Sequence, residues 1–571
     1  MAWYDEAVFY HIYPLGLTGS PKENSYSEPV HRLNTLLPWI SHIKDLGCNA
    51  LYIGPLFESV GHGYETTDYK KLDSRLGTNE DLTNFVKECH THGIWVILDG
   101  VFNHTGRDFF AFQDIKKNRE NSPYKDWYCN VNFWGNNEYN DGFSYENWGG
   151  YNLLAKLNQS NPAVKDYICD VIRFWVSEYD IDGIRLDAAD VLNFEYMQAL
   201  RRIANEVKPD FWLMGEVIHG DYNRWVNEGT LHSVTNYHLH KALYSGHNDH
   251  NYFEIAHTVK RLYEMGGNRP EGLKLYNFVD NHDVERIYTK LSNKAHYTPV
   301  HILLYTLPGV PSVYYGSEFG IDGKKERFSD DSLRPALSLS DFGNAISANP
   351  CTRLLAALGH IRQTTPALSY GDYKELLLTN RQYAFSRTHN GISVLVTVNN
   401  DDSDYVMTLP CGVCAQYKGT LSGELVTVTD GRISVNVKAN SGDIWDPVAE
   451  GTNEPSCTDE VSVSCTIPDA TEESLQEEDW FFDSAFITNP EPKQVSAEDM
   501  DSPVTEETTA SASPVGSLSP DESFTQGKIA GLQEAILAIM EKKGPVTEQM
   551  RRDVINNTHH DSLVNWIKSF Y

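Results

Sequence analysis

Basic residues are scarce in this sequence. Its 571 residues include 47 Lys and Arg against 79 Asp and Glu, which gives a formal net charge of −32. Nucleic acids and anionic membranes need a basic binding surface, so this balance argues against either partner. No stretch approaches the ~18 apolar residues of a membrane-spanning helix. The first residues also lack the basic and apolar regions of a signal peptide, so we expect a soluble, cytoplasmic protein.

Paired cysteines are missing as well. The nine cysteines are an odd number, and Cys411-Gly-Val-Cys414 is the single C-x-x-C spacing. Because no second pair lies near it, a metal or redox site there is disfavoured, and we expect small buried thiols instead.

Acidic residues concentrate near the C-terminal end. Residues 450–526 contain nineteen Asp or Glu and one Lys, which is just over half of the excess negative charge. Few large apolar residues accompany them, so the composition predicts a disordered acidic linker over 449–526. Helical spacing returns at Ile529, Leu532 and Ile536, which predicts a small helical module over 527–571. A module of this size is marginally stable alone, and we expect it to dock on the catalytic body or on another protein.

Before residue 366, short apolar runs alternate with helical patterns, which is typical of a parallel sheet covered by helices. The runs predict eight strands, at 7–14, 50–55, 95–101, 183–187, 211–217, 233–238, 275–279 and 310–315. Residues 104–160 interrupt this rhythm, with abundant Asn, Gly, Trp and Tyr and no helical period. We therefore predict an α/β fold, a (β/α)8 TIM barrel over 1–365 with a small subdomain at 104–160, inserted after strand 3.

The pattern changes to period two after Pro366. Runs at 383–387, 392–398, 405–409 and 433–437 alternate apolar and polar residues, and Asn-Gly and Asp-Gly turns separate some of them. Alternation with such turns predicts an antiparallel β-sandwich domain over 366–448.

Ionisable residues gather where several predicted barrel strands end. Asp187 ends the fourth strand two residues after Arg185, Glu216 lies at the end of the fifth, and Asp283 lies just beyond the seventh. Catalytic groups of TIM barrels lie at these C-terminal strand ends. A carboxylate pair facing one mouth suits glycoside hydrolysis, with one as nucleophile or stabiliser and the other as proton donor. Because Arg185 neighbours Asp187, we expect Asp187 to be ionised. Glu216 has no basic neighbour, neither Lys nor Arg, within three positions, so we expect it to keep a raised pKa.

These segments resemble the four signature regions of the α-amylase family of glycoside hydrolases. The regions are Asp99–His104, Gly183–Asp187, Gly215–Glu216 and Phe278–Asp283, in the family's order and on the corresponding strands. Gly63–Tyr69 is similar to the loop after the family's second strand, although Glu65 stands where many relatives have Asp. Leu154–Asn158 resembles a motif of members that act on cyclodextrins, pullulan and short maltodextrins, although their N-terminal β domain is absent.

The resemblance implies a retaining mechanism with Asp187 as nucleophile, Glu216 as general acid and then base, and Asp283 as stabiliser of the transition state. It also implies that Tyr64 stacks on the sugar and that His104 and His282 bind its hydroxyls. Arg185 and Arg334 complete the expected site, Arg185 beside the nucleophile and Arg334 near the next sugar.

The implied activity is hydrolysis of α-1,4-glucosidic bonds in malto-oligosaccharides or other α-glucans, through a covalent glucosyl-enzyme. A transglycosylase with the same intermediate and a non-catalytic carbohydrate-binding scaffold remain the alternatives. No cofactor is expected. Calcium stays open, since Asn103 matches a ligand of calcium-binding members, whereas Ser20–Ser27 lacks their Asp-x-Asn-x-Asp loop. We expect no other metal site.

Overall fold

Eight parallel strands form the centre of the protein. The computed structural model describes residues 2–267, 272–327 and 329–448. The strands follow the order β11-β10-β9-β5-β2-β1-β13-β12, and a parallel bridge between Thr235 and Tyr276 joins the two ends of this sheet. They are β1 (Phe9–Ile12), β2 (Ala50–Ile53), β5 (Trp95–Gly100), β9 (Gly183–Leu186), β10 (Trp212–Gly215), β11 (Ser233–Val234), β12 (Tyr276–Asn277) and β13 (Val310–Tyr314). The predicted eight-stranded parallel sheet is thus confirmed.

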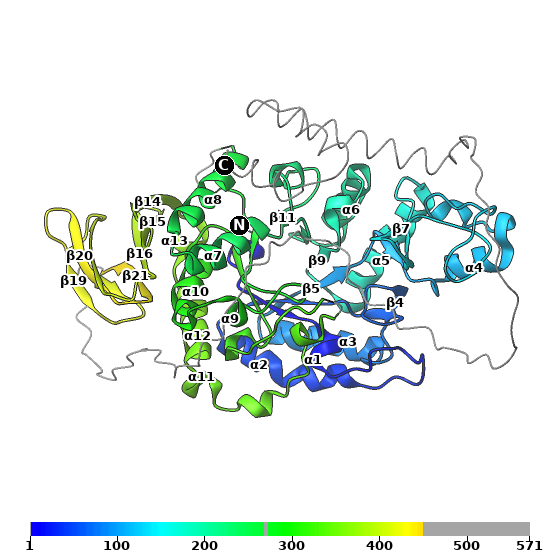
Figure 1. Cartoon of the computed structure of the whole chain (residues 1–571), viewed down its shortest axis with the longest axis horizontal. Coiled ribbons are helices and arrows are strands. Elements are labelled where there is room, and N and C mark those ends of the chain that lie inside the picture. Colours follow the sequence, from blue (N-terminus) through cyan, green and yellow to red (C-terminus); the bar gives the residue numbers. More distant parts are fainter. Residues whose placement is uncertain (1, 268–271, 328, 449–571) are drawn as a thin grey trace, which may run out of the picture. The chain divides into compact units, whose positions relative to one another are not determined.

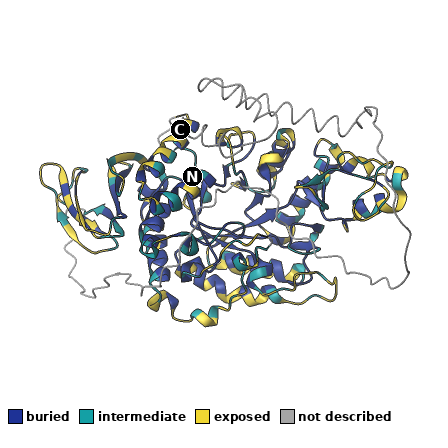
Figure 2. Cartoon of the chain, in the orientation of Figure 1, coloured by how far each residue is buried: buried dark blue, intermediate teal, exposed yellow. Residues whose placement is uncertain are grey.

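Helices cover the outside of this sheet (Figure 1). Large side chains fill its inside. Phe9, Tyr52, Ile97, Trp212 and Met214 belong to one buried cluster contributed by several strands. Figure 2 shows the strands as buried, whereas the helices expose one face. The helices are α2 (Leu37–Asp45), α3 (Asn79–Thr91), α5 (Pro162–Tyr179), α6 (Phe194–Val207), α7 (Tyr237–Asn248), α8 (Tyr252–Met265), α10 (Tyr297–Thr306) and α12 (Pro350–Thr364).

Local sequence sets where these helices begin. Thr78 accepts a hydrogen bond from the Asp81 amide, and the Asp81 carboxylate binds the Thr78 amide in return, which forms a capping box for α3. Asn161 caps α5 ahead of Pro162, a residue whose fixed φ suits the first helical position. Asn193 caps α6 in the same way as Asn161 caps α5.

Two predicted elements differ in detail. The helical pattern of 33–46 is divided into a 3-10 turn, Arg32–Leu36, and α2, which has Pro38 in its first turn. The predicted strand 233–238 ends at Val234, because Asn236 caps a helix, α7, that the sequence analysis missed. Tyr237 and His238, which the prediction placed on the strand, lie on α7.

Residues 104–160 contain more regular structure than predicted. Strands β6 (His104–Thr105), β8 (Tyr151–Lys156) and β7 (Asn147–Trp148) form a small antiparallel sheet. The expectation of no helix here is wrong, since α4 spans Phe110–Asn118 and buries Ala111, Phe112 and Ile115. With only nine residues, α4 is too short for its period to stand out. Strand β6 pairs with β8 and carries His104, so this segment meets the barrel at the predicted site.

An antiparallel β domain follows the barrel. One sheet has the order β14-β15-β16-β21-β18-β19, and β17 pairs with β20 in a second. Asn390-Gly391 and Asp430-Gly431 have positive φ, as the predicted two-residue turns require. The strands are β14 (Asp372–Leu378), β15 (Gln382–His389), β16 (Ile392–Asn399), β17 (Tyr405–Pro410), β18 (Gln416–Gly419), β19 (Leu425–Thr427), β20 (Arg432–Val437) and β21 (Ser441–Pro447).

Some predictions fall outside the described residues or stay untested. The acidic linker (449–526) and the helical module (527–571) lie outside them, and the domain boundaries at 365 and 448 stay predictions. The seven cysteines within the described ranges form no disulfide with one another, and four of them are buried. Over the same ranges, no helix has the length and apolar character needed to cross a bilayer.

Candidate active site

Strand register brings four charged residues together at the C-terminal end of the sheet. Asp99 on β5 pairs directly with Arg185 on β9, and Gly215 on β10 pairs with Leu186. Asp187 and Glu216 each follow their strand by one residue, so both emerge at the same edge. Parallel strands in register thus place side chains from three separate segments around one point.

Arg185 lies at the centre of this group. Its Nη1 lies 2.9 Å from Asp99 Oδ1 and 3.0 Å from Asp187 Oδ1. Its Nη2 lies 2.9 Å from Glu216 Oε2, and the Ala188 amide donates to the same oxygen at 3.0 Å. One guanidinium therefore binds three carboxylates, and its own side chain is almost fully buried.

Burial and the shared contact with Arg185 both affect the pKa values of Asp187 and Glu216. Burial raises the pKa of Asp187 well above its usual range, and the pKa of Glu216 is raised for the same reason, while Arg185 lowers both. Arg185 thus lowers the pKa of Asp187, as expected, but burial outweighs it, and an ionised Asp187 in the free enzyme stays a prediction. The expectation that Glu216 lacks a basic neighbour holds only along the sequence, since Arg185 contacts it in space. The raised pKa of Glu216 itself agrees with the prediction.

Asp283 has a different environment. Arg334 Nη2 lies 2.8 Å from Asp283 Oδ1, and His282 Nε2 lies 3.0 Å from Oδ2. Burial raises the pKa of Asp283, but His282, Arg334 and Lys325 outweigh it and hold that pKa well below its usual range. Its side chain keeps 32% of its surface accessible. Asp283 is thus the carboxylate that stays ionised most firmly.

Aromatic rings fix the position of His282. The ring of Tyr64 stacks on it at 5.8 Å and 12°, and the ring of Tyr13 at 5.8 Å and 15°. The Tyr64 hydroxyl donates to Asp99 Oδ2 at 3.2 Å and lies 2.5 Å from His282 Nε2. Tyr64 therefore connects the Arg185 group with the Asp283 group. Burial lowers the pKa of His282 to about 3, so this imidazole is neutral at neutral pH.

His104 is buried beside Tyr64. Its Nε2 donates to the Tyr64 carbonyl oxygen at 3.1 Å, and its Nδ1 faces the Asn103 amide at 3.3 Å. Both ring nitrogens thus have protein partners, and contact with a sugar hydroxyl stays a prediction. Burial lowers the pKa of His104 to about 3.

The surroundings of Asn103 do not fit a calcium ion. Its side-chain oxygen accepts a hydrogen bond from Gln159 at 3.0 Å, and its backbone oxygen accepts one from the Leu157 amide. Calcium needs six to eight oxygen ligands, usually including carboxylates. In the part of the chain that is described, no group of three or more His, Cys, Asp or Glu could hold a metal.

Three site residues were missed by the sequence analysis. Asp99 was seen as part of a motif, but its contact with Arg185 follows only from strand register. Tyr13 comes directly after β1, so its position at a strand end was an available signal. Lys325, whose Nζ donates to the Asp283 backbone oxygen at 2.7 Å, lies in a loop after β13 and carries no comparable signal.

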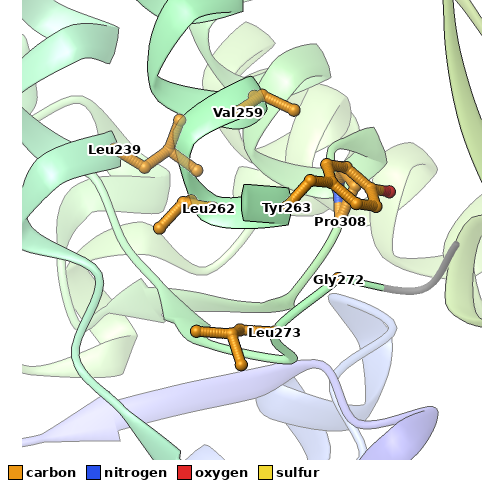
Figure 3. Close-up of a pocket in the computed structure, with 7 residues that line it drawn as sticks. All are labelled: Leu239, Val259, Leu262, Tyr263, Gly272, Leu273 and Pro308. Carbon is orange, nitrogen blue, oxygen red and sulfur yellow. The ribbon is translucent and has the colours of Figure 1, made fainter. Parts of the chain in front are cut away.

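The apolar cavity in Figure 3 is separate from this site. It lies between α7, α8 and the chain around Leu273, and no charged side chain lines it. An uncharged cavity offers no group for acid–base chemistry. Its lining residues are Leu239, Val259, Leu262, Tyr263, Gly272, Leu273 and Pro308.

Comparison with known proteins identifies the family. The model for the α-amylase catalytic domain matches residues 28–347. The chain belongs to the α-amylase family of glycoside hydrolases. Within this family it is 30% identical over 446 residues to a cyclomaltodextrinase from a Bacillus species, covering 74% of this chain and 77% of that protein. It is 29% identical over 468 residues to neopullulanase 2 from Thermoactinomyces vulgaris, covering 77% of each.

Solved structures of α-amylase family members share the architecture. A cyclomaltodextrinase structure aligns with a TM-score of 0.68 and 25% identity over 78% of both chains. An α-amylase from Anoxybacillus aligns with a TM-score of 0.66 and 25% identity, over 79% of this chain and all of that one. The resemblance found in the sequence is confirmed, and the protein is a glycoside hydrolase of a family that retains anomeric configuration.

Proposed function

We propose that this enzyme hydrolyses α-1,4-glucosidic bonds of malto-oligosaccharides, with Asp187 as nucleophile and Glu216 as acid and base. The observation that carries the proposal is the binding of Asp187 and Glu216 by the two terminal nitrogens of Arg185. This arrangement supplies two carboxylates that share a single cation and can flank the scissile bond. Double displacement needs such a pair close together, about 5 Å apart, rather than at the wider spacing of inverting enzymes.

The shared cation also accounts for the proton that the reaction needs. Three carboxylates against one guanidinium leave an excess of negative charge, which favours retention of a proton on the pair Asp187 and Glu216. Positive charge that develops at the sugar C1 favours ionised Asp187 and leaves the proton on Glu216.

In the first step, an Asp187 oxygen bonds to C1 while Glu216 gives its proton to the departing glycosidic oxygen. In the second, Glu216 takes a proton from water, the water oxygen bonds to C1, and the Asp187 ester breaks. Asp283, which Arg334 and His282 hold ionised, stabilises the positive charge on the sugar in both steps.

Tyr64 and His282 offer a surface for the sugar undergoing cleavage. Aromatic rings bind the apolar face of a sugar, and the neutral His282 has polar ring atoms for its hydroxyls. Arg334 lies against Asp283 and over the ring of Tyr13, 4.7 Å from its centre. We propose that Arg334 holds Asp283 in place and meets the adjoining sugar.

The names of the relatives support the substrate class. They include cyclomaltodextrinases, a maltogenic amylase and a neopullulanase. We therefore propose linear and cyclic malto-oligosaccharides as substrates, with no cofactor required, because the proposed residues supply the nucleophile, the proton and the charge stabilisation.

A time course with maltoheptaose tests this function. Products separated by size, with their anomeric form recorded, should be shorter α-configured sugars alone. Products longer than seven units would show that sugar outcompetes water as acceptor, and the enzyme would be a transglycosylase. Initial β-configured products would overturn the retaining assignment.

A further inference from the structure

Tyr64 lies on a short loop whose backbone amides and carbonyl groups both form hydrogen bonds with buried side chains. The loop connects β3 (Phe57–Ser59) to β4 (Thr66–Leu72), and Glu65 ends it. The Glu65 carboxylate is buried and receives three backbone amides of its own loop, from Gly61 at 3.4 Å, His62 at 3.3 Å and Gly63 at 3.1 Å. A ring of amides around one carboxylate is a favourable anion site.

The charge of Glu65 has little other compensation. No Lys or Arg among the described residues forms an ion pair with it. His62 Nε2 lies 3.0 Å from the Glu65 carboxylate, but burial lowers the pKa of His62 and disfavours a charge there. Burying a carboxylate without a cation is costly unless hydrogen bonds replace the lost water. The three amides supply those bonds, so the carboxylate and the loop conformation depend on each other.

Two other buried side chains donate hydrogen bonds to the carbonyl groups of the same loop. Arg75 Nη1 donates to the Gly61 oxygen at 2.6 Å, and the Tyr13 hydroxyl donates to the His62 oxygen at 2.5 Å. Gly63 has a φ of +102°, and a Cβ there would lie 2.3 Å from the Pro55 ring. The loop therefore has a single tight conformation that a glycine permits.

This conformation reaches the catalytic site through two rings. Tyr64 leaves the loop one residue before Glu65, and Tyr13 is tied to the loop through the His62 oxygen. Both rings stack on His282, each 5.8 Å from it. Displacement of the loop would therefore move both rings that contact His282.

We infer that Glu65 is a positioning residue for catalysis, which fixes the Tyr64 loop so that Tyr64, His282 and Tyr13 keep the geometry required by the transition state. The inference rests on the proposed function, because it assigns these rings to the sugar undergoing cleavage. The length of the glutamate side chain is also required, because an Asp at this position would hold its carboxylate one methylene farther from the three amides.

Glu65→Gln tests this role because it preserves the shape of the side chain while removing its charge. The glutamine keeps one acceptor oxygen but turns an NH2 donor toward amide N–H donors, which repels the loop. Misplacement of substrate contacts by about 1 Å can cost on the order of 100-fold in rate. We expect kcat on maltoheptaose to fall 10- to 100-fold while KM changes less than threefold. Affinity for acarbose, used as a transition-state mimic, should weaken by the same factor as kcat/KM.

Glu58→Gln is the matched control. Glu58 is a buried carboxylate on β3 in the same hairpin, but it binds the Ser74 amide at 2.7 Å and Lys71 at 2.8 Å instead of the Tyr64 loop. Glu58→Gln should lower Tm as much as Glu65→Gln does, yet keep wild-type kcat and acarbose affinity. Glu65→Asp, which keeps the charge, should fall between wild type and Glu65→Gln.

Either of two outcomes overturns the inference while wild-type turnover is intact. One is that Glu65→Gln and Glu65→Asp retain wild-type kcat and acarbose affinity. The other is that Glu65→Gln and Glu58→Gln lose kcat in equal proportion to their loss of Tm, which would show that Glu65 only stabilises the fold. A wild-type enzyme that cannot turn over maltoheptaose would instead count against the proposed function.

Discussion

Arg185 Nη2 lies 2.9 Å from Glu216 Oε2, although the two residues are 31 positions apart, Arg185 on β9 and Glu216 directly after β10. The same guanidinium contacts Asp187. The electrostatics of the proposed nucleophile and acid are therefore not independent, because both respond to one cation and to each other.

This coupling predicts the pH profile of Glu216→Gln. The negative charge of Glu216 raises the pKa of Asp187, so its removal should lower that pKa and move the acidic limb of kcat/KM to lower pH. The basic limb, which requires a protonated acid, should disappear. Measured on maltoheptaose, kcat should fall by on the order of 10³-fold, within the usual range for a lost general acid.

A substrate that needs no acid provides the control for that variant. Fluoride leaves without protonation, so Glu216→Gln should form a covalent glycosyl-enzyme from α-maltosyl fluoride far faster than from maltoheptaose. Equal loss on both substrates would contradict the assignment of Glu216 as the acid.

Arg185→Lys should be severely impaired despite its conserved charge. A lysine presents one compact ammonium, whereas the guanidinium reaches Asp99, Asp187 and Glu216 together from two nitrogens. We expect kcat to fall at least about 100-fold, by analogy with other losses of preorganised charge. Arg173→Lys, at an exposed ion pair with Glu206, is the control and should retain wild-type activity.

Chelation should have no effect on this enzyme. Asn103 is bonded to Gln159, and the described residues form no cluster of metal ligands. Incubation with EDTA followed by gel filtration should leave Tm and kcat unchanged. A drop in Tm that added calcium reverses would show that the protein binds calcium, and would contradict this prediction.

Stability should decline on mild acidification. Burial lowers the pKa of His240 and His247 to about 3 and that of His301 to about 4, from an unfolded value near 6.5. The unfolded chain therefore binds more protons than the folded one between those values, and stability is lost as pH falls from about 6.5 toward 4. Calorimetry should show Tm decreasing across this window, above the range in which ordinary carboxylates titrate. A flat Tm down to pH 5 would contradict these histidine environments.

Much of the fold followed from the sequence because its signals are local. The strand runs and the helices 162–179 and 194–207 have matching apolar periods and caps, and the structure confirms them. Helix α7 was hidden because only two residues separate it from the two-residue strand β11, within the segment predicted as one strand. Helix α4 was hidden because its buried face comprises three residues.

The site followed only in part from the sequence, for a different reason. Strand ends identified Asp187, Glu216 and Asp283, since position on a barrel strand is readable from pattern. The sharing of Arg185 with Asp99 and Glu216 depends on register between strands, which no single segment encodes. The contact of Arg334 with Asp283 joins residues 51 positions apart and likewise required the folded chain.

The central claim is that Asp187 forms a covalent bond with the sugar. The most direct measurement is intact and peptide mass spectrometry of Glu216→Gln after reaction with α-maltosyl fluoride, in which the ester should form and hydrolyse slowly. The account predicts one maltosyl adduct, located on the peptide that contains Asp187 and absent in the double variant with Asp187→Asn. An adduct on another carboxylate, or product release without any adduct in a variant that still turns over, would contradict it.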